Sequence, residues 1–243
     1  MKKLLTGLGV LVVVLGVVFA VVYGKLGYLI KRGVDTYGPP IAGTDVSLGS
    51  AEVSIFSGEG SLGNLRVGNP EGYSKDEAFD LGKIAIAVDP KSVTGKVIHV
   101  RSLVIDSPKL LAEFDPAGKS NLDKIMEHVR AAAGGGSSGG GKSNGSSSPP
   151  PRLIVDEFRF ENGEVRALAP SFKVDKTVKI PSVVLKNLGA KEGGATPAQL
   201  ADDILRPIVS NAVHAAEQEY LGAQKDKLKD KAKEKLMDRL FGK

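Results

Sequence analysis

Few residues of this 243-residue sequence have the types and spacing that catalysis or metal binding requires. The three histidines, His99, His128 and His214, lie in different segments, and no spacing between them is typical of metal ligands. The chain has no cysteine, which excludes a thiolate nucleophile, a cysteine-bound metal and a disulfide framework. We therefore expect each histidine to be a surface or edge residue without a catalytic role.

The carboxylates and the glycines give no better candidates for a reacting group. Asp45, Asp89, Asp106 and Asp156 fall at the ends of predicted strands or alternate out of them, where solvated carboxylates are expected. The glycines of residues 58–63 sit in a strand turn with no helix after it, so they do not predict a phosphate-binding loop. The sequence predicts no enzyme, no metal and no cofactor.

The composition limits the partners and the kind of core that the chain can have. The formal net charge is +5, and much of it lies near the C-terminus, so the charge does not indicate nucleic-acid binding. Aromatic residues make up 5% of the chain and tryptophan is absent, so we expect a core of valine, isoleucine and leucine.

The first 32 residues are predicted to form a membrane anchor with a short juxtamembrane segment. The run from Leu4 to Tyr23 has no charge, and as a helix it would span ~30 Å, the thickness of a bilayer's hydrocarbon core. A cleaved signal peptide is the alternative, but Val18–Ala20 matches its cleavage pattern poorly. Lysines on both sides leave the orientation open. The anchor positions include Leu4, Leu8, Leu11, Leu15, Phe19 and Val22.

Residues 33–130 and 152–195 are predicted to form one β-rich domain with flanking helices, an α+β fold. Short runs rich in valine and isoleucine end at turn residues about every 10 to 15 positions, which favours a meander of antiparallel strands. Several strands carry apolar residues on both faces. This pattern fits either a curved sheet with an apolar groove or a two-sheet sandwich. The candidate groove-lining residues are Ile84, Ile86, Val88, Leu103, Ile105, Phe158 and Phe160.

A strand–turn–strand pattern occurs twice, at an offset of about 55 residues. The first copy, residues 97–114, has β-branched strands and a turn at Pro108, which indicates a hairpin. The second copy, residues 153–167, has Gly163 at the corresponding place. The repeat suggests one sheet built from duplicated hairpins, and chance similarity between two amphipathic hairpins is the alternative.

A low-complexity linker, residues 131–151, interrupts this domain. A Gly/Ser chain cannot offset its ordering entropy by burial, so we predict a disordered insertion in a loop. It does not indicate a domain boundary. Ser120 to Ala132, just before it, has an apolar stripe at helical spacing and predicts a helix.

Residues 196–243 are predicted to form a long amphipathic charged helix. Thr196 is suited to cap this helix and Pro197 to begin it, whereas Pro207 should kink or break it. Towards the C-terminus, acidic and basic residues recur every four positions beside an apolar stripe. This surface is either a solvated face stabilised by ion pairs or one that docks on anionic lipid or another helix. The candidate docking residues are Leu228, Leu236, Leu240, Lys227, Lys231 and Lys235.

Several segments together resemble the AsmA-like proteins of bacterial envelopes. They are GSAEVSIFSGEGSLGNLRVGNPEGYS, LGKIAIAVDPKSV, VIHVRSLVIDSPKLLAEF and NLDKIM, with IPSVVLKNLGAKEGGATPAQLADDIL near the end of the domain. The resemblance covers most of Ile41 to Leu205 outside the linker. It implies an inner-membrane anchor, a periplasmic β-rich domain with a curved apolar groove, and a role in lipid transport or outer-membrane homeostasis.

These observations predict a transmembrane helix, a curved antiparallel β-sheet or groove, and a long C-terminal helix. We expect a non-enzymatic, single-pass membrane protein, and the resemblance implies that it lies in the bacterial inner membrane with its soluble domain in the periplasm. Its groove would bind or help to transfer phospholipid acyl chains. The alternative is a scaffold that uses its sheet edge and C-terminal helix to bind envelope proteins or a second copy. No nucleic-acid partner is expected.

Overall fold

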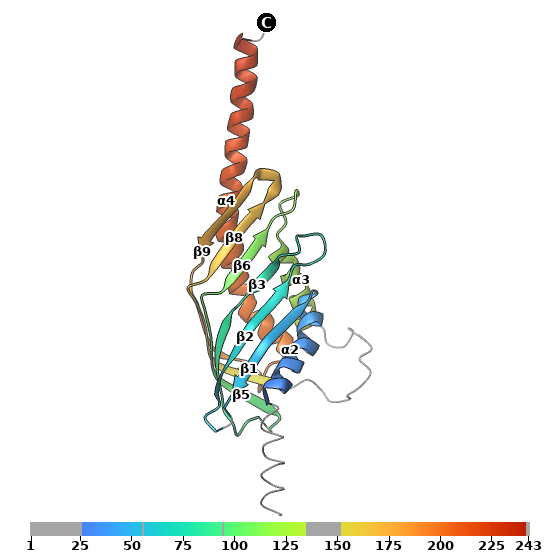
Figure 1. The fold of residues 1–243 in the computed structure, drawn as a ribbon, viewed down its shortest axis with the longest axis vertical. Coiled ribbons are helices and arrows are strands. Elements are labelled where there is room, and N and C mark those ends of the chain that lie inside the picture. The colour runs from blue at the N-terminus through green and yellow to red at the C-terminus, as the bar shows by residue number, and fades with distance from the viewer. Residues whose placement is uncertain (1–25, 55, 94, 135–151, 242–243) are drawn as a thin grey trace, which may run out of the picture.

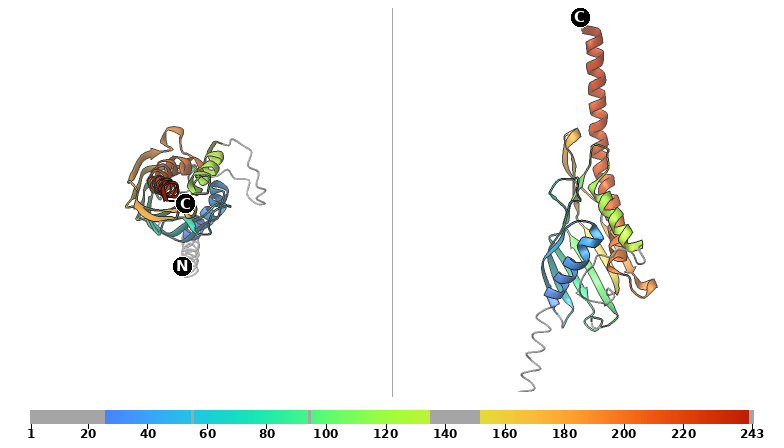
Figure 2. Two further views of the ribbon diagram at one scale, coloured as in Figure 1. Left: turned by 90° about the horizontal axis from the view of Figure 1, so that it is seen from above. Right: turned by 90° about the vertical axis from the view of Figure 1, so that its right-hand side faces the viewer.

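The structure, a computed structural model, describes residues 26–241 except 55, 94 and 135–151. It has a mixed α+β fold in which a ten-stranded sheet curls around two helices, α3 and α4 (Figures 1 and 2). The predicted curved sheet and long C-terminal helix are therefore confirmed. The predicted anchor, Leu4–Tyr23, and most of the predicted linker lie outside the described residues.

Helix α2, Leu26–Ala42, packs on strand β1, Val46–Val53. The helix continues through Gly38, Pro39 and Pro40, although these residue types usually end a helix. Gly43 ends it instead, because its φ is +69° and its N–H donates to the carbonyl of Pro39 at 2.9 Å. This left-handed C-cap is a sufficient stop signal, and the proline rings keep a helical φ.

The ten strands form one sheet in which β2 pairs with β1 on one side and with β3 and β4 in succession on the other. The remaining strands continue from β4 as β5, β7 and β10, and from β3 as β6, β8 and β9. Their bounds are β2 Glu59–Gly68, β3 Glu77–Asp80, β4 Lys83–Val88, β5 Val97–Asp106, β6 Lys109–Glu113, β7 Arg152–Glu161, β8 Glu164–Ala169, β9 Val174–Lys179 and β10 Val183–Leu188.

A transverse crease crosses this sheet. It passes through one residue of β2 and through one residue at each of the junctions β3–β4, β5–β6 and β7–β8. The crease residues are Asn64, Gly82, Ser107 and Asn162, and each has a φ between +52° and +55°. This left-handed conformation is uncommon outside glycine, and in a strand it bends the chain and interrupts the alternation of side chains. Four such bends in line allow the sheet to curl around the helices.

The strand segments on the two sides of the crease run in the same direction. Ile84 pairs with Ile105 and Phe79 with Leu110, so one antiparallel register continues from β4–β5 into β3–β6. The chain at Pro108 therefore bends without reversing, and the hairpin predicted there is wrong. The physical reason is the left-handed residue just before Pro108, which bends the strand in place of a reversing turn.

The two copies of the sequence repeat lie side by side in parallel. Val97 pairs with Arg152 and Asp106 with Glu161, and the same offset continues from β6 to β8. The predicted correspondence between the copies is confirmed, but the prediction of a purely antiparallel sheet is wrong. The segment between β6 and β7, which contains α3, supplies the long crossover that a parallel connection needs.

The crease also explains why the strands carry apolar residues at both odd and even positions. Ile105 and Leu110 are both buried core residues although they are five positions apart, and so are Phe160 and Val165. In a straight strand such an odd spacing would put the two side chains on opposite faces. The two-sided apolar pattern therefore does not require a second sheet, and the sandwich alternative is wrong.

Helices α3, Asn121–Gly134, and α4, Pro197–Phe241, fill the concave side of the sheet (Figure 2). The helix predicted over residues 120–132 is thus confirmed as α3. Helix α4 packs on α3 and on strands β6 to β10. Ala212 and Ala216 of α4 are fully buried, and their small side chains let the helix approach the sheet closely.

Helix α4 is 45 residues long, which corresponds to ~67 Å. The break expected at Pro207 is absent, because Ile208 and Val209 directly after it are buried and hold the helix in the core. Tyr220 ends the buried part, with its ring stacked on Phe114 at 5.0 Å. After Tyr220 the helix still contacts the body through Lys227, whose Nζ bonds to the carbonyl of Ser171, and its C-terminal part projects beyond the sheet (Figure 1).

Candidate functional site

Three rows of apolar side chains cross the concave face on the β4–β5–β7–β10 side of the crease. Directly paired residues in neighbouring strands share a face of a sheet. The rows are Ile84, Ile105, Phe160 and Val183; Ile86, Leu103, Phe158 and Leu185; and Val88, Val100, Val155 and Leu188. All seven candidate groove-lining residues fall in these rows, so the structure brings them together on one face.

Five of these seven candidates lie in the packed core. Ile84, Val88, Ile105, Phe158 and Phe160 are at most 9% exposed, so they do not line an open groove in this structure. The helices share this core with the sheet, and their apolar residues cover it. The other two candidates, both in the middle row, are half-buried.

The concave face is less covered where β4 and β5 meet the start of β7, a region called the open end below. Its apolar residues Ile86, Ile98, Leu103 and Leu153 are half-buried and adjoin the core. In the described part of the chain, the helices make their main strand contacts with β1 and with β6 to β10. None of these main contacts is with β4 or β5. Figure 2 shows this part of the sheet between α2 and α4.

The open end offers only hydrocarbon for binding. Its four side chains carry no hydrogen-bonding group, so a sugar or a nucleotide would lose contacts with water there without replacement. An apolar ligand has no hydrogen bonds to water to lose. Full burial of a leucine or isoleucine side chain contributes about 1.5–3 kcal/mol. The chemistry of the open end therefore fits an apolar chain.

Two open-end residues, Ile98 and Leu153, are absent from the residues predicted to line a groove. They are direct partners across β5 and β7, and they lie two positions before Val100 and Val155 in the third row. The repeat contained the signal that would have found them, because it aligns Ile98 with Leu153 as its first apolar pair.

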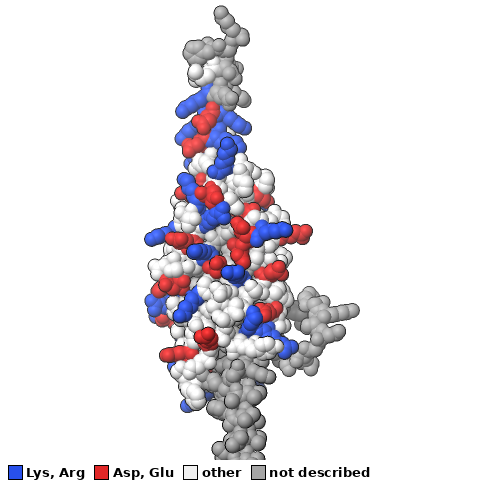
Figure 3. All heavy atoms as spheres, in the orientation of Figure 1, with Lys and Arg blue, Asp and Glu red and all other residues white. Residues whose placement is uncertain are grey.

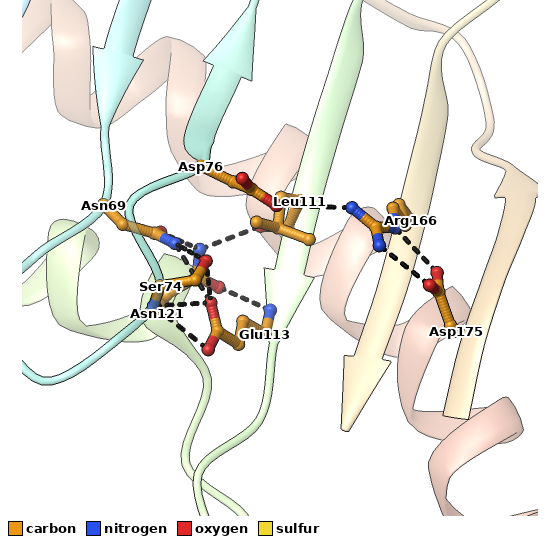
Figure 4. Close-up of polar contacts among 8 residues, drawn as sticks. All are labelled: Asn69, Ser74, Asp76, Leu111, Glu113, Asn121, Arg166 and Asp175. Atoms are coloured by element: carbon orange, nitrogen blue, oxygen red, sulfur yellow. Dashed lines mark hydrogen bonds and ion pairs between the residues drawn. The ribbon is translucent and has the colours of Figure 1, made fainter. Parts of the chain in front are cut away.

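A partly buried polar cluster joins α3 and β6 to the loop before β3 (Figure 4). Glu113 accepts hydrogen bonds from the backbone N–H of Ser74 at 3.0 Å, from its hydroxyl at 2.6 Å and from Nδ2 of Asn69 at 3.1 Å. Asn121 is fully buried, accepts from the N–H of Glu113 and donates to the carbonyl of Leu111, both at 2.9 Å. These mutual bonds give the cluster a structural role.

Positive and negative side chains are interspersed on the outer face of the sheet (Figure 3). Arg166 donates to both carboxylate oxygens of Asp175, at 2.6 and 2.7 Å (Figure 4). These hydrogen bonds, with the positive charge of the guanidinium, lower the pKa of Asp175. Arg166 also borders an open hollow of about 510 Å³, where it pairs with Asp76 at 3.3 Å. The pair of Arg166 and Asp175 ties β8 to β9, so we expect it to affect the stability of the fold.

The structure does not bring the histidines together. His99 lies in β5, His128 in α3 and His214 in α4. Across the described ranges, no group of three or more His, Asp or Glu side chains is arranged to hold a metal ion.

The predicted docking residues near the C-terminus have different environments. Leu228 and Leu236 are 66% and 59% exposed. Lys227 instead reaches back to the body, where its Nζ donates to the carbonyl of Ser171 at 3.1 Å and lies 5.0 Å from the centre of the Phe172 ring. Lys231 is exposed, and the side chains of Lys235 and Leu240 lie outside the described part of the chain.

Comparisons with known proteins do not identify the class of this protein. No family model, no curated protein and no solved structure matches the chain. Among the helices that the structure describes, none is long and apolar enough to cross a membrane. The resemblance to AsmA-like proteins and the membrane anchor stay predictions from the sequence.

Proposed function

We propose that this chain is a membrane-anchored, AsmA-like protein of the bacterial envelope that binds the acyl chains of lipids without catalysis. In this proposal the chain spans the inner membrane once and holds its sheet domain in the periplasm. Its role is to bind phospholipid, or to help to transfer it, in support of the outer membrane and the envelope.

The observation that carries the proposal is the half-buried state of Ile86 and Leu103 within a continuous apolar row. Their row partner Phe158 is fully buried, so the apolar surface runs from the core to the open end without a polar interruption. An acyl chain that lies along this surface gains about 0.8 kcal/mol for each methylene that it buries. The losses of translational and conformational freedom on binding reduce that gain.

The position of α2 supports a source of lipid close to the domain. The predicted anchor, Leu4–Tyr23, ends just before α2 begins at Leu26, and α2 packs directly on β1. The sheet domain therefore follows the anchor without a long spacer. A lipid that leaves the bilayer would have only a short path to the open end.

The scaffold alternative depends on a free sheet edge. One edge strand is β1, on which α2 packs, and Lys31 of α2 bonds to the carbonyl of Leu48 in this strand. The strands at the other edge, β9 and β10, are poorly suited to pair with another chain. They carry Lys176, Lys179 and Lys186, which are exposed. Exposed lysines on an edge strand discourage edge-to-edge pairing. We therefore favour lipid binding over the scaffold function.

The experiment compares Leu103→Gln with Val104→Gln in the full-length chain. The two residues are neighbours in β5 and both are half-buried, but Val104 pairs with Ala85 and Arg159 on the outer face. Lipid that co-purifies with each variant is extracted and quantified per mole of protein. We expect Leu103→Gln to retain about tenfold less lipid, because the amide is desolvated without a partner, and Val104→Gln to match the unaltered chain. Equal retention by both variants would contradict the proposal.

A further inference from the structure

The end of α4, residues 221–241, presents apolar side chains that the sheet domain does not cover. Leu221, Leu228 and Leu236 are 48%, 66% and 59% exposed. The helix projects beyond the sheet in this region (Figures 1 and 3). Exposed leucines that share one side of a projecting helix form a surface suited to a partner.

The leucines and the charges are arranged in order around this helix. With about 100° per residue, one narrow stripe consists of Leu221, Leu228, Ala232 and Leu236. Lys225 falls within the stripe and Lys229 on its flank, whereas Asp226 and Asp230 fall on the opposite side. These two lysines are therefore near the apolar stripe, and these carboxylates are remote from it.

The stripe faces away from the body of the protein. Lys227, which bonds to the carbonyl of Ser171 at 3.1 Å, lies about 100° around the helix from Leu228 and about 140° from the centre of the stripe. Because the Lys227 side of the helix faces the sheet domain, Leu228 faces outward, in agreement with its exposure of 66%. The stripe is thus free to meet an external surface.

The charges distinguish between two kinds of surface. Residues 221–241 contain seven Lys or Arg and four Asp or Glu. A second copy of the helix would place Lys225 in the apolar seam and lysines opposite lysines, which weakens helix pairing. A bilayer with anionic headgroups instead accepts the leucines below its surface, while the lysine ammonium groups extend to the phosphates.

We infer that residues 221–241 dock on the surface of an anionic bilayer with the leucine stripe towards the acyl region. This docking is independent of the proposed acyl-chain binding, because the segment shares no residue with the open end. It is also remote from the start of α2, which lies at the opposite end of the described molecule (Figure 1). The two proposals can therefore fail separately.

The absence of cysteine from the chain allows a local test on the full-length protein. Leu228→Cys and Asp230→Cys each receive a polarity-sensitive fluorophore, and the chain is incorporated into phosphatidylcholine nanodiscs. Vesicles of phosphatidylcholine alone, or with phosphatidylglycerol added, are then titrated in. We expect a blue shift at position 228 with the anionic vesicles only, and none at position 230.

A second comparison tests the stripe itself. Adding Leu221→Asp and Leu236→Asp to the labelled Leu228→Cys chain should raise the vesicle concentration for half-maximal shift about tenfold, since both leucines leave the apolar region. High salt should also raise the vesicle concentration for half-maximal shift, because it screens the lysine charges. The inference is overturned by equal shifts with neutral vesicles, by no shift with anionic vesicles, or by a shift that precedes vesicle addition. It is also overturned if positions 228 and 230 respond equally.

Discussion

Ile105 of β5 and Phe160 of β7 are direct partners in a parallel register, and both side chains are buried on the concave face. Each lies two residues before the crease residue of its strand, Ser107 or Asn162. The two copies of the sequence repeat therefore meet position by position. This register aligns the apolar rows, among them the middle row that contains Ile86 and Leu103.

Gly163 allows the crease to approach Phe160 closely. A Cβ atom at this position would lie 2.6 Å from Cε1 of Phe160 and 2.9 Å from Cγ1 of Ile180. We expect Gly163→Ala to lower the free energy of unfolding by about 1–3 kcal/mol, because the core there has no room for a methyl group. Denaturant unfolding checks this, with Gly222→Ala as the control. Gly222 has open space around it, so its replacement should be neutral or stabilising. Equal changes in the free energy of unfolding at both positions would show that the core at Gly163 has room for a methyl group.

Asn162 holds the crease in a conformation that most residues avoid. Its φ is +55°, and its Nδ2 donates to Oδ1 of Asp106 at 2.7 Å. We expect Asn162→Ala to cost about 1–2 kcal/mol of stability, from the strained backbone and the lost hydrogen bond. Asn162→Gly should cost less, because glycine adopts this φ freely. Thermal unfolding gives the order, and an alanine variant as stable as the glycine variant would argue against a strained crease.

Asn121 is the central member of the polar cluster in Figure 4. Its side chain is fully buried and bonds to the backbone of both Leu111 and Glu113. Replacement by alanine leaves those backbone groups buried without partners, so we expect a loss of about 1–3 kcal/mol in the free energy of unfolding. Urea unfolding measures it, and hydrogen exchange at Glu113 should accelerate in the variant. An unchanged midpoint would show that the cluster does not stabilise the fold.

The ion pair of Asp175 with Arg166 predicts a pH dependence whose sign is determined by the lowered pKa of Asp175. Because the folded-state pKa lies below the unfolded value of about 3.9, the contribution to stability is complete above that pH. It is lost as the pH falls through the folded-state pKa. Asp175→Asn should therefore lower the melting temperature slightly at neutral pH, and the difference should vanish in acid. The same replacement in an Arg166→Gln background should have no effect at any pH, and a persistent difference there would exclude this pair as the cause.

The classes of element could be predicted from the sequence, because each has a local signal. Thr196 and Pro197 mark the start of α4, and the side chain of Gln199 bonds to the N–H of Thr196 at 2.9 Å as in a reciprocal cap. The repeat likewise predicted which residues of β5 and β7 correspond. These features depend on residues close together in the chain or on direct similarity.

The crease and the covering of the concave face could not be predicted in the same way. Ser107 and Pro108 are turn-forming residues that fit either a reversing hairpin or a bend within a continuing strand, and local sequence does not distinguish the two. Which apolar rows are buried depends on where α4 packs, a tertiary contact that the strand pattern does not encode. For the same reason the contact of Lys227 with Ser171 could not be foreseen.

The most direct test of lipid binding is photochemical labelling of the full-length chain with a phospholipid that carries a diazirine in its acyl chain. Mass spectrometry then locates each labelled residue. Lipid binding at the open end predicts labels on Ile86, Ile98, Leu103 and Leu153, in addition to any within the predicted anchor. Labels confined to the predicted anchor, or equally frequent on the outward-facing Val104 and Val184, would contradict it.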